Sequence, residues 1–327
     1  MQFDIRNMSR DKVKSMAFDK IYGSLPKKPL HLDIDPIMED DGFAAGRALY
    51  RNDFLIIETE EAVIKIPFVS VIPHSTKPIP AIISLNFERN VPNKFLPAEE
   101  IADRGYALFS LSIDDISTND ANYKTGVYRQ LVKSRKKNNS PGKIAIWAYV
   151  ASVLCDHIYT LSAIDKSKIG ISGHHTCALA AMLAAGIDEK INFVIANNAL
   201  AAFSPMANLE NIGSVMAYDH PYLFCPTFAE DPLNQCPFVM MELCKGKKLL
   251  IGCAEDDMRS NYQTEYEILR KTRFYEIGDQ LPCLAEKSHT RPLIFENDDT
   301  SFHLRSGRSY FGRDDWNIYL DFLDKNL

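Results

Sequence analysis

The feature that most constrains the fold is an alternation of short apolar runs with helical stretches, which begins after Asp53. The expected strands cover residues 54–60, 62–73, 80–87, 106–113, 168–172, 191–198 and 247–255. Helices are expected over 10–22, 97–104, 144–163, 177–185, 262–271 and 315–324, with an acidic connection at 33–41 and an irregular region at 199–241. Apolar runs of this kind are typical of strands buried on both faces. The sequence therefore predicts an α/β fold with a mostly parallel sheet, helices on both faces and an antiparallel N-terminal edge.

The length of the chain suits one large core. Its 327 residues are 46% hydrophobic, and no stretch is long enough or polar enough to separate two domains. We therefore predict an N-terminal extension over residues 1–50, packed on a main α/β domain over residues 51–327.

Charge and cysteine usage limit the location and the partners. The net charge of −6 disfavours nucleic acid or an anionic membrane as a partner, and no window approaches the roughly 18 apolar residues of a membrane span. The first residues lack a signal-peptide pattern, and the seven cysteines lack paired spacing, so we expect a cytoplasmic protein with reduced cysteines. We expect no cofactor and no metal. A small molecule is the expected ligand, and a protein partner is unknown.

The stretch Lys168–Ala181, KIGISGHHTCALAA, has the layout of a nucleophile elbow. In such a turn a buried strand passes sharply into a helix and presents one side chain, usually the attacking serine of a hydrolase, above the sheet. Gly173 suits the close approach before the turn, and the residue at the tip is His175. An imidazole therefore stands where a hydroxyl would be expected.

Ligands of open α/β sheets gather at the carboxyl ends of the strands. The side chains expected at this edge follow the predicted strands, and they are Glu88, Arg89, Asn90, Asp114, Asp115, His174, His175, Asn198, Glu255, Asp256 and Asp257.

Several segments in order resemble the α/β hydrolases of the glucuronoyl esterase and acetyl xylan esterase-like family. They are IISLNFERN, GKIAIWAYVASVLCDHIYTLSAIDKSKIGISGHH, DEKINFVIANNA, HPYLFCPTF, KKLLIGCAEDD and FHLRSGRSYFGRDDWNIYLDFL. The resemblance covers roughly residue 44 to the C-terminus. It implies the α/β hydrolase fold and a carbohydrate ester as the substrate class.

The same resemblance implies positions for a catalytic triad, and these positions are degenerate. The family's elbow reads Gly-x-Ser-Arg-x-Gly-Lys, which here is GHHTCAL, so His175 takes the nucleophile position. The base position, after an Arg-x-Gly-x motif, is Ser309, and the acid position is Asp256 or its neighbour Glu255. The implied substrate contacts are Asn86, His174, Thr176 and Glu255.

Loss of both serine and histidine predicts loss of ordinary esterase turnover. In a protease, removing either residue costs about 10⁶ in turnover, roughly 8 kcal/mol of barrier. The leading interpretation is therefore a non-catalytic protein that keeps a pocket for a small ligand. The alternatives are an active ester hydrolase with an atypical nucleophile, such as His175 oriented by Asp256, and a structural or interaction protein.

Other reactive residues have structural interpretations as well. His174, His175, Cys177 and Asp256 could suggest a metal site, but adjacent histidines point in different directions, which favours a hydrogen-bonded pair lining a pocket. Ser172 is expected to be buried in its strand. The remaining histidines are interpreted as structural, and among them are His289 and His303, of which His303 lies near the base position. Arg305 and Trp316 also need no ligand.

Overall fold

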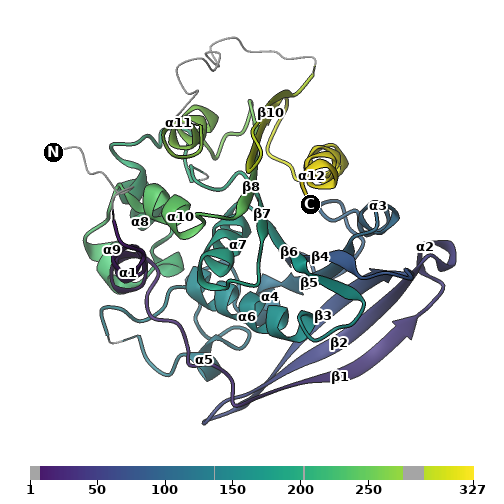
Figure 1. The fold of residues 1–327 in the computed structure, drawn as a ribbon. Coiled ribbons are helices and arrows are strands. Elements are labelled where there is room, and N and C mark those ends of the chain that lie inside the picture. Colours follow the sequence, from purple (N-terminus) through teal and green to yellow (C-terminus); the bar gives the residue numbers. More distant parts are fainter. Residues whose placement is uncertain (1–7, 136, 202, 275–290) are drawn as a thin grey trace.

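The computed structural model describes residues 8–135, 137–201, 203–274 and 291–327. Its centre is a ten-stranded sheet with the order β1-β2-β3-β5-β4-β6-β7-β8-β10-β9 (Figure 1). The strands are β1 (His31–Asp40), β2 (Ala48–Glu58), β3 (Val63–Pro73), β4 (Ile79–Asn86), β5 (Ala107–Ser112), β6 (Ile164–His174), β7 (Phe193–Asn197), β8 (Lys248–Ala254), β9 (Leu293–Glu296) and β10 (Thr300–Arg305). The predicted α/β class is confirmed.

Strand directions divide the sheet into a parallel centre and two antiparallel edges. The strands β5, β4, β6, β7, β8 and β10 are parallel to their neighbours in the centre. The pairs β1·β2, β2·β3 and β3·β5 are antiparallel at one edge, and β9·β10 is antiparallel at the other. The carboxyl ends of the central strands therefore meet at one edge of the sheet, where the functional side chains were expected.

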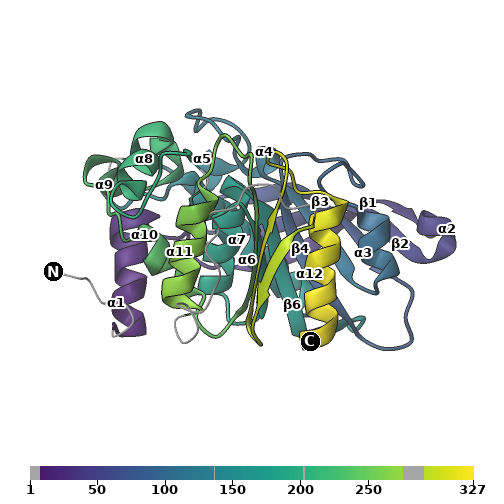
Figure 2. The same ribbon diagram turned by 90° about the horizontal axis from the view of Figure 1, so that it is seen from above.

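Helices cover both faces of the sheet (Figures 1 and 2). The first face is covered by α3 (Ala98–Asp103) and α12 (Arg313–Asn326), which bury Trp316, Tyr319 and Phe322 against the sheet. The opposite face carries the larger core. Its helices and turns are α4 (Ile113–Ile116), α5 (Tyr128–Leu131), α6 (Lys143–Ile158), α7 (Thr176–Ile187), α8 (Ile212–Asp219), the 3₁₀ turn η3 (Pro221–Leu223), α9 (Pro226–Glu230), α10 (Cys236–Leu243) and α11 (Tyr262–Thr272).

The N-terminal residues contribute to both the core and the sheet. A helix, α1 (Arg10–Ser15), continues as a π-helical turn, η2 (Met16–Ile21), and buries Val13, Ala17, Ile21 and Tyr22 in the main core. The short α2 (Phe43–Gly46) joins β1 to β2. The acidic connection expected at residues 33–41 instead belongs largely to the edge strand β1. The domain division at residue 50 stays a prediction.

The edge strand β1 is largely exposed. Its pairing with β2 shifts register between Pro36 and Met38, which marks a bulge. Acidic side chains occur along it at Asp33, Asp35, Glu39 and Asp40. Pro36 cannot donate a ladder hydrogen bond, so this strand is suited to an edge and not to the centre of the sheet.

The largest departure from the predicted elements lies between β7 and β8. The region 199–241, expected to be irregular, contains α8, η3, α9 and most of α10. These helices are short, and Pro221, Pro226 and Pro237 lie in the first turns of η3, α9 and α10, where proline is tolerated. None of them is long enough to show a clear helical period in the sequence. The helix α6 also ends earlier than expected, at Ile158, because the residues after it form a turn into β6.

Candidate functional site

The turn between β6 and α7 has the backbone of a nucleophile elbow. His175 lies between the two elements with φ 57° and ψ −122°, a conformation that L-residues rarely adopt. Its N–H donates to the carbonyl of Asn197 at the end of β7, at 2.9 Å. A Cβ at Gly173 would lie 2.4 Å from the backbone of Cys177, so only glycine fits before the turn. The strand–turn–helix layout of this motif is therefore present, with an imidazole at its tip.

The strain at this turn yields a testable stability difference. We expect His175→Gly to be more stable toward urea than His175→Ala by about 1 kcal/mol, because glycine adopts this backbone freely and alanine does not. Both variants lack the imidazole, so their difference isolates the backbone. Equal midpoints in urea unfolding would show that the turn relaxes in the protein.

The His175 ring is enclosed by aromatic side chains. Its Nε2 atom is buried and has no hydrogen-bond partner among the described residues, and the ring contacts Phe203 edge to face at 5.9 Å between centroids. The Phe203 ring contacts His220 in turn, at 5.3 Å. Burial, together with the neighbouring His174, lowers the pKa of His175 to about 3. The imidazole is therefore neutral at physiological pH.

His174 occupies a different environment from its neighbour. Its Nδ1 lies 2.7 Å from Asn197 Oδ1, and its ring lies between Phe95, at 6.2 Å, and Phe311, at 6.1 Å. Burial lowers the pKa of His174, although the hydrogen bond with Asn197 opposes the shift. Because the Asn197 amide nitrogen donates to the Tyr319 hydroxyl at 3.1 Å, its oxygen is the atom that faces His174.

A second polar group joins the elbow to the last loop. The Nδ2 atom of Asn198 donates to Asp257 Oδ2 at 2.7 Å and to Ser309 Oγ at 3.0 Å. Ser309 Oγ also lies 3.4 Å from His174 Nε2. Asn198 has φ 50°, a conformation that asparagine tolerates better than most residues. Side chains from the end of β6 and from the segments that follow β7, β8 and β10 therefore meet at one point.

The structure does not bring all the implied site residues into this group. Asp256 is exposed, whereas Asp257 is buried and accepts from Ser260 Oγ at 2.8 Å as well as from Asn198. The backbone N–H groups of Glu255 and Asp256 donate to the carbonyls of Arg305 and Gly307, which ties the two loops together. The assignment of Asp256 as the acid stays a prediction, and Asp257 is the carboxylate that faces the group.

The two remaining implied contacts lie at the end of β4 and at the start of α7. Asn86 is 5% exposed, and its Nδ2 atom is buried without a partner among the described residues. The Thr176 hydroxyl accepts from Asn119 Nδ2 at 3.3 Å and is also buried. Among the described residues, no hydrogen bond joins either side chain to the group around Ser309. Their role in binding stays a prediction.

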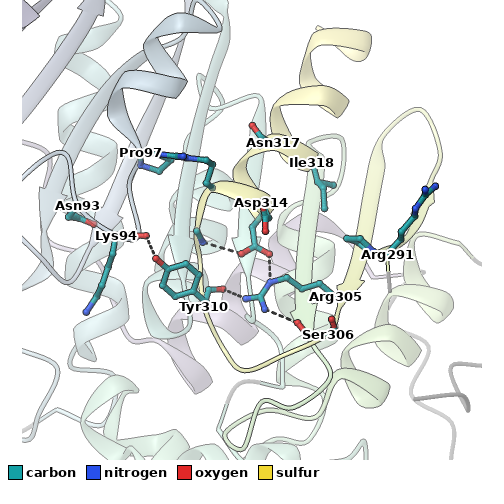
Figure 3. Close-up of a pocket in the computed structure, with 14 residues that line it drawn as sticks. Asn93, Lys94, Pro97, Arg291, Arg305, Ser306, Tyr310, Asp314, Asn317 and Ile318 are labelled. Carbon is teal, nitrogen blue, oxygen red and sulfur yellow. Dashed lines mark hydrogen bonds and ion pairs between the residues drawn. The ribbon is translucent and has the colours of Figure 1, made fainter. Parts of the chain in front are cut away.

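The loop that carries Ser309 is held by a buried ionic cluster, which sequence reasoning interpreted only as structural. Arg305 Nε and His303 Nε2 each lie 2.9 Å from Asp315 Oδ1. The other nitrogens of Arg305 donate to the carbonyls of Ser306 and Tyr310 (Figure 3). One of them also donates to the carbonyl of Arg308. One guanidinium therefore fixes both ends of the turn around Ser309.

A cavity of about 740 Å³ is lined in part by this loop. Figure 3 shows side chains from the segment after β4, the loop after β10 and the start of α12 around it. Its lining residues are Asn93, Lys94, Pro97, Arg291, Pro292, Arg305, Ser306, Tyr310, Gly312, Arg313, Asp314, Asp315, Asn317 and Ile318. The Phe95 ring contacts both His174 and Tyr310, so it links the elbow to the cavity wall.

His174, His175, Cys177 and Asp256 are the residues that could suggest a metal site in the sequence. In the part of the chain that the structure describes, no group of three or more potential ligands is placed to hold a metal ion. Six cysteines are buried and free, and Cys283 and His289 lie outside the described residues. None of the described helices is long and apolar enough to cross a membrane. The predicted cytoplasmic location stays a prediction.

Comparison with known proteins identifies similar sequences and folds. The family described as "Glucuronyl esterase, fungi" matches residues 57–202, which include β3 to β7 and the elbow. A glucuronoyl esterase structure from Solibacter usitatus superposes with a TM-score of 0.82 at 18% identity, covering 98% of this chain and 92% of that one. The chain resembles the glucuronoyl esterases. It has their α/β hydrolase fold, and the predicted resemblance is confirmed.

Two further similar proteins, a carbohydrate esterase and a glucuronoyl esterase, extend the comparison. The curated carbohydrate esterase MZ0003, from an unknown prokaryotic organism, is 24% identical over 245 residues, which are 70% of this chain. The chain spans 55% of the length of that relative. A mutant glucuronoyl esterase from Sporotrichum thermophile, solved in complex with methyl 4-O-methyl-β-D-glucopyranuronate, matches with a TM-score of 0.66 at 14% identity, covering 97% of this chain and 81% of that one.

Proposed function

We propose that this chain binds a small carbohydrate ester or uronic acid at the carboxyl edge of the sheet and does not hydrolyse it by way of the elbow. The observation that carries the proposal is the imidazole of His175 on a strained elbow backbone, with Nε2 enclosed. A neutral imidazole packed against Phe203 has no hydroxyl to deprotonate. The position opposite, Ser309, holds no histidine that could act as base.

The cavity beside the last loop supports retention of a ligand. Its volume of about 740 Å³ lies in the range of small-molecule sites. The lining mixes polar groups with the apolar Pro97, Ile318 and Tyr310 ring, a combination that suits the hydroxyls and faces of a sugar ring. The glucuronate ester bound by the Sporotrichum thermophile relative is the natural first ligand to test.

Binding can be measured as stabilisation against heat. With methyl 4-O-methyl-β-D-glucopyranuronate at about 100 times its Kd, we expect about 2.7 kcal/mol of added stability, and no methanol release that depends on His175. Asn317→Trp, on the cavity wall, should abolish the stabilisation. Lys325→Trp, exposed on the same helix outside the cavity, is the matched control and should leave it unchanged.

Two results would contradict this proposal in different ways. Ester turnover that disappears in His175→Ala, together with acylation of the His175 ring in the wild type, would identify the elbow imidazole as a nucleophile. If the ester, the free uronic acid and acetylated sugars all fail to stabilise the protein, the proposed class of ligand is excluded. Recovery of one stoichiometric protein partner would then favour an interaction role.

A further inference from the structure

Hydrogen bonds around His174 determine which of its ring nitrogens carries the proton. The Asn197 amide nitrogen is committed to Tyr319, so its oxygen can only accept from His174 Nδ1–H. Since burial lowers the pKa of His174, the ring is neutral and Nε2 has a free lone pair. His174 Nε2 is therefore a proton acceptor, and Phe95 and Phe311 hold the ring in this orientation.

The hydroxyl that faces this acceptor belongs to Ser309. Its Oγ lies 3.4 Å from His174 Nε2 and accepts from Asn198 Nδ2 at 3.0 Å, so the hydroxyl proton is directed toward the imidazole. Hydrogen bonds between catalytic groups are often this long before a substrate is bound. The Ser309 side chain is half-buried, which leaves an approach to its oxygen.

The three side chains thus have the relative arrangement of a nucleophile (Ser309), a base (His174) and an orienting group (Asn197). Their positions in the chain differ from those of the triad in a hydrolase whose nucleophile is the elbow serine. We propose that Ser309 is a nucleophile that accepts an acyl group from a carboxylic ester, with His174 as its base and Asn197 as the positioning residue. This activity goes beyond the proposed binding function, because it needs only a reactive acyl donor and no sugar.

The chemical step balances within these groups. Ser309 Oγ attacks the ester carbonyl carbon while its proton passes to His174 Nε2. The bond from carbon to the leaving alkoxide oxygen then breaks, and His174 returns the proton to that oxygen, which gives a free alcohol and an acyl-serine. Water can later hydrolyse the acyl-serine with His174 again as base. Asn197 keeps Nδ1 protonated throughout, as the amide does in proteases that pair cysteine, histidine and asparagine.

Acylation at a defined serine is the direct test. The intact protein should gain one acetyl group from p-nitrophenyl acetate, or one phosphonyl group from a fluorophosphonate with release of fluoride, and peptide mapping should place either group on Ser309. Ser309→Ala should abolish this labelling, and His174→Ala should slow it at least 10²-fold, the scale of general-base assistance. Ser75→Ala, at an exposed serine bonded to the carbonyl of Lys77, should label like the wild type.

The role of Asn197 has its own readout. Asn197→Asp places a carboxylate behind His174, which would stabilise the imidazolium that forms during attack, so labelling should become at least 10-fold faster. Asn197→Leu, which cannot accept from Nδ1, should slow it. A residue needed only for folding would give losses in both variants, and thermal unfolding of each variant separates that outcome from a change in reactivity.

The outcomes are separable from those of the binding proposal. Labelling of Ser309 without stabilisation by the uronate ester would leave this inference standing and remove the proposed ligand. Labelling at His175, labelling that persists in Ser309→Ala, or a wild-type protein that gains no mass from either reagent would overturn the inference, whatever the ligand experiments show.

Discussion

Replacing Asp315 with alanine is expected to lower the free energy of unfolding by about 3–5 kcal/mol, the usual cost of removing one partner from a buried ion pair. The carboxylate is 1% exposed and accepts from His303, Arg305 and the backbone N–H of Gly312 at the start of α12. Burial raises the pKa of Asp315, but His303 and Arg305 outweigh it, so this pKa lies below its ordinary value. Its loss would leave a partly buried guanidinium without its anion.

The neighbouring carboxylate provides the control for this experiment. Asp314 is also in the first turn of α12 but is exposed, so Asp314→Ala should change the unfolding free energy by less than about 1 kcal/mol. The change in unfolding free energy of each variant can be measured from its midpoint in urea, provided that the dependence of the free energy on urea concentration is unchanged. Because Arg305 also holds the turn around Ser309, Asp315→Ala should slow acylation of Ser309 as well. Similar stabilities for the two variants would contradict the role assigned to the ionic cluster.

Acidification is expected to destabilise the protein through His175. Its folded pKa of about 3 lies below the ordinary value of about 6.5, so between these pH values the unfolded chain binds more protons than the folded one. Stability therefore falls as the pH drops through this window. From pH 7 to pH 4.5 the loss due to His175 should be about 2–3 kcal/mol, at roughly 1.4 kcal/mol per pH unit.

The His175→Ala variant isolates this effect. This variant lacks the titrating ring. Between the same two pH values its free energy of unfolding should therefore fall by about 2–3 kcal/mol less than that of the wild type. His174, whose pKa is also lowered by burial, remains in both proteins and cancels in the comparison. Parallel pH dependences in the wild type and the variant would show that the His175 ring is well solvated or readily released.

Local patterns in the sequence were sufficient to predict the central strands of the sheet and the elbow. The buried runs that became β4 to β8 are apolar on both faces, and Gly173 followed by small residues identifies a turn into a packed helix. The strand β10 was missed because its residues, TSFHLR, include polar side chains that are buried against α12 rather than exposed. Their partners, such as Asp315, lie on another element and leave no local signal.

The contacts of the site depend on geometry that no short pattern records. The acidic run after β8 predicted a carboxylate at the sheet edge, but the turn there decides that Asp257 faces inward and Asp256 faces solvent. The contact between His174 and Ser309 joins residues 135 positions apart. The sequence around each of these two residues carries no sign of the contact. They are brought together by the register of β6 beside β7 and by the hydrogen bonds of Arg305 to the loop around Ser309.

The bulged outer strand β1 affects how copies of the protein meet. Two such strands placed side by side would set Asp33, Asp35, Glu39 and Asp40 of one molecule near their counterparts in the other, and the kink at Pro36 would interrupt the shared hydrogen-bond ladder. The β1 edges of two molecules therefore repel each other electrostatically. The outer backbone of β1 has N–H and C=O groups that no neighbouring strand of the ten-stranded sheet uses. We nevertheless expect a concentrated solution of the protein to resist fibre formation along this strand.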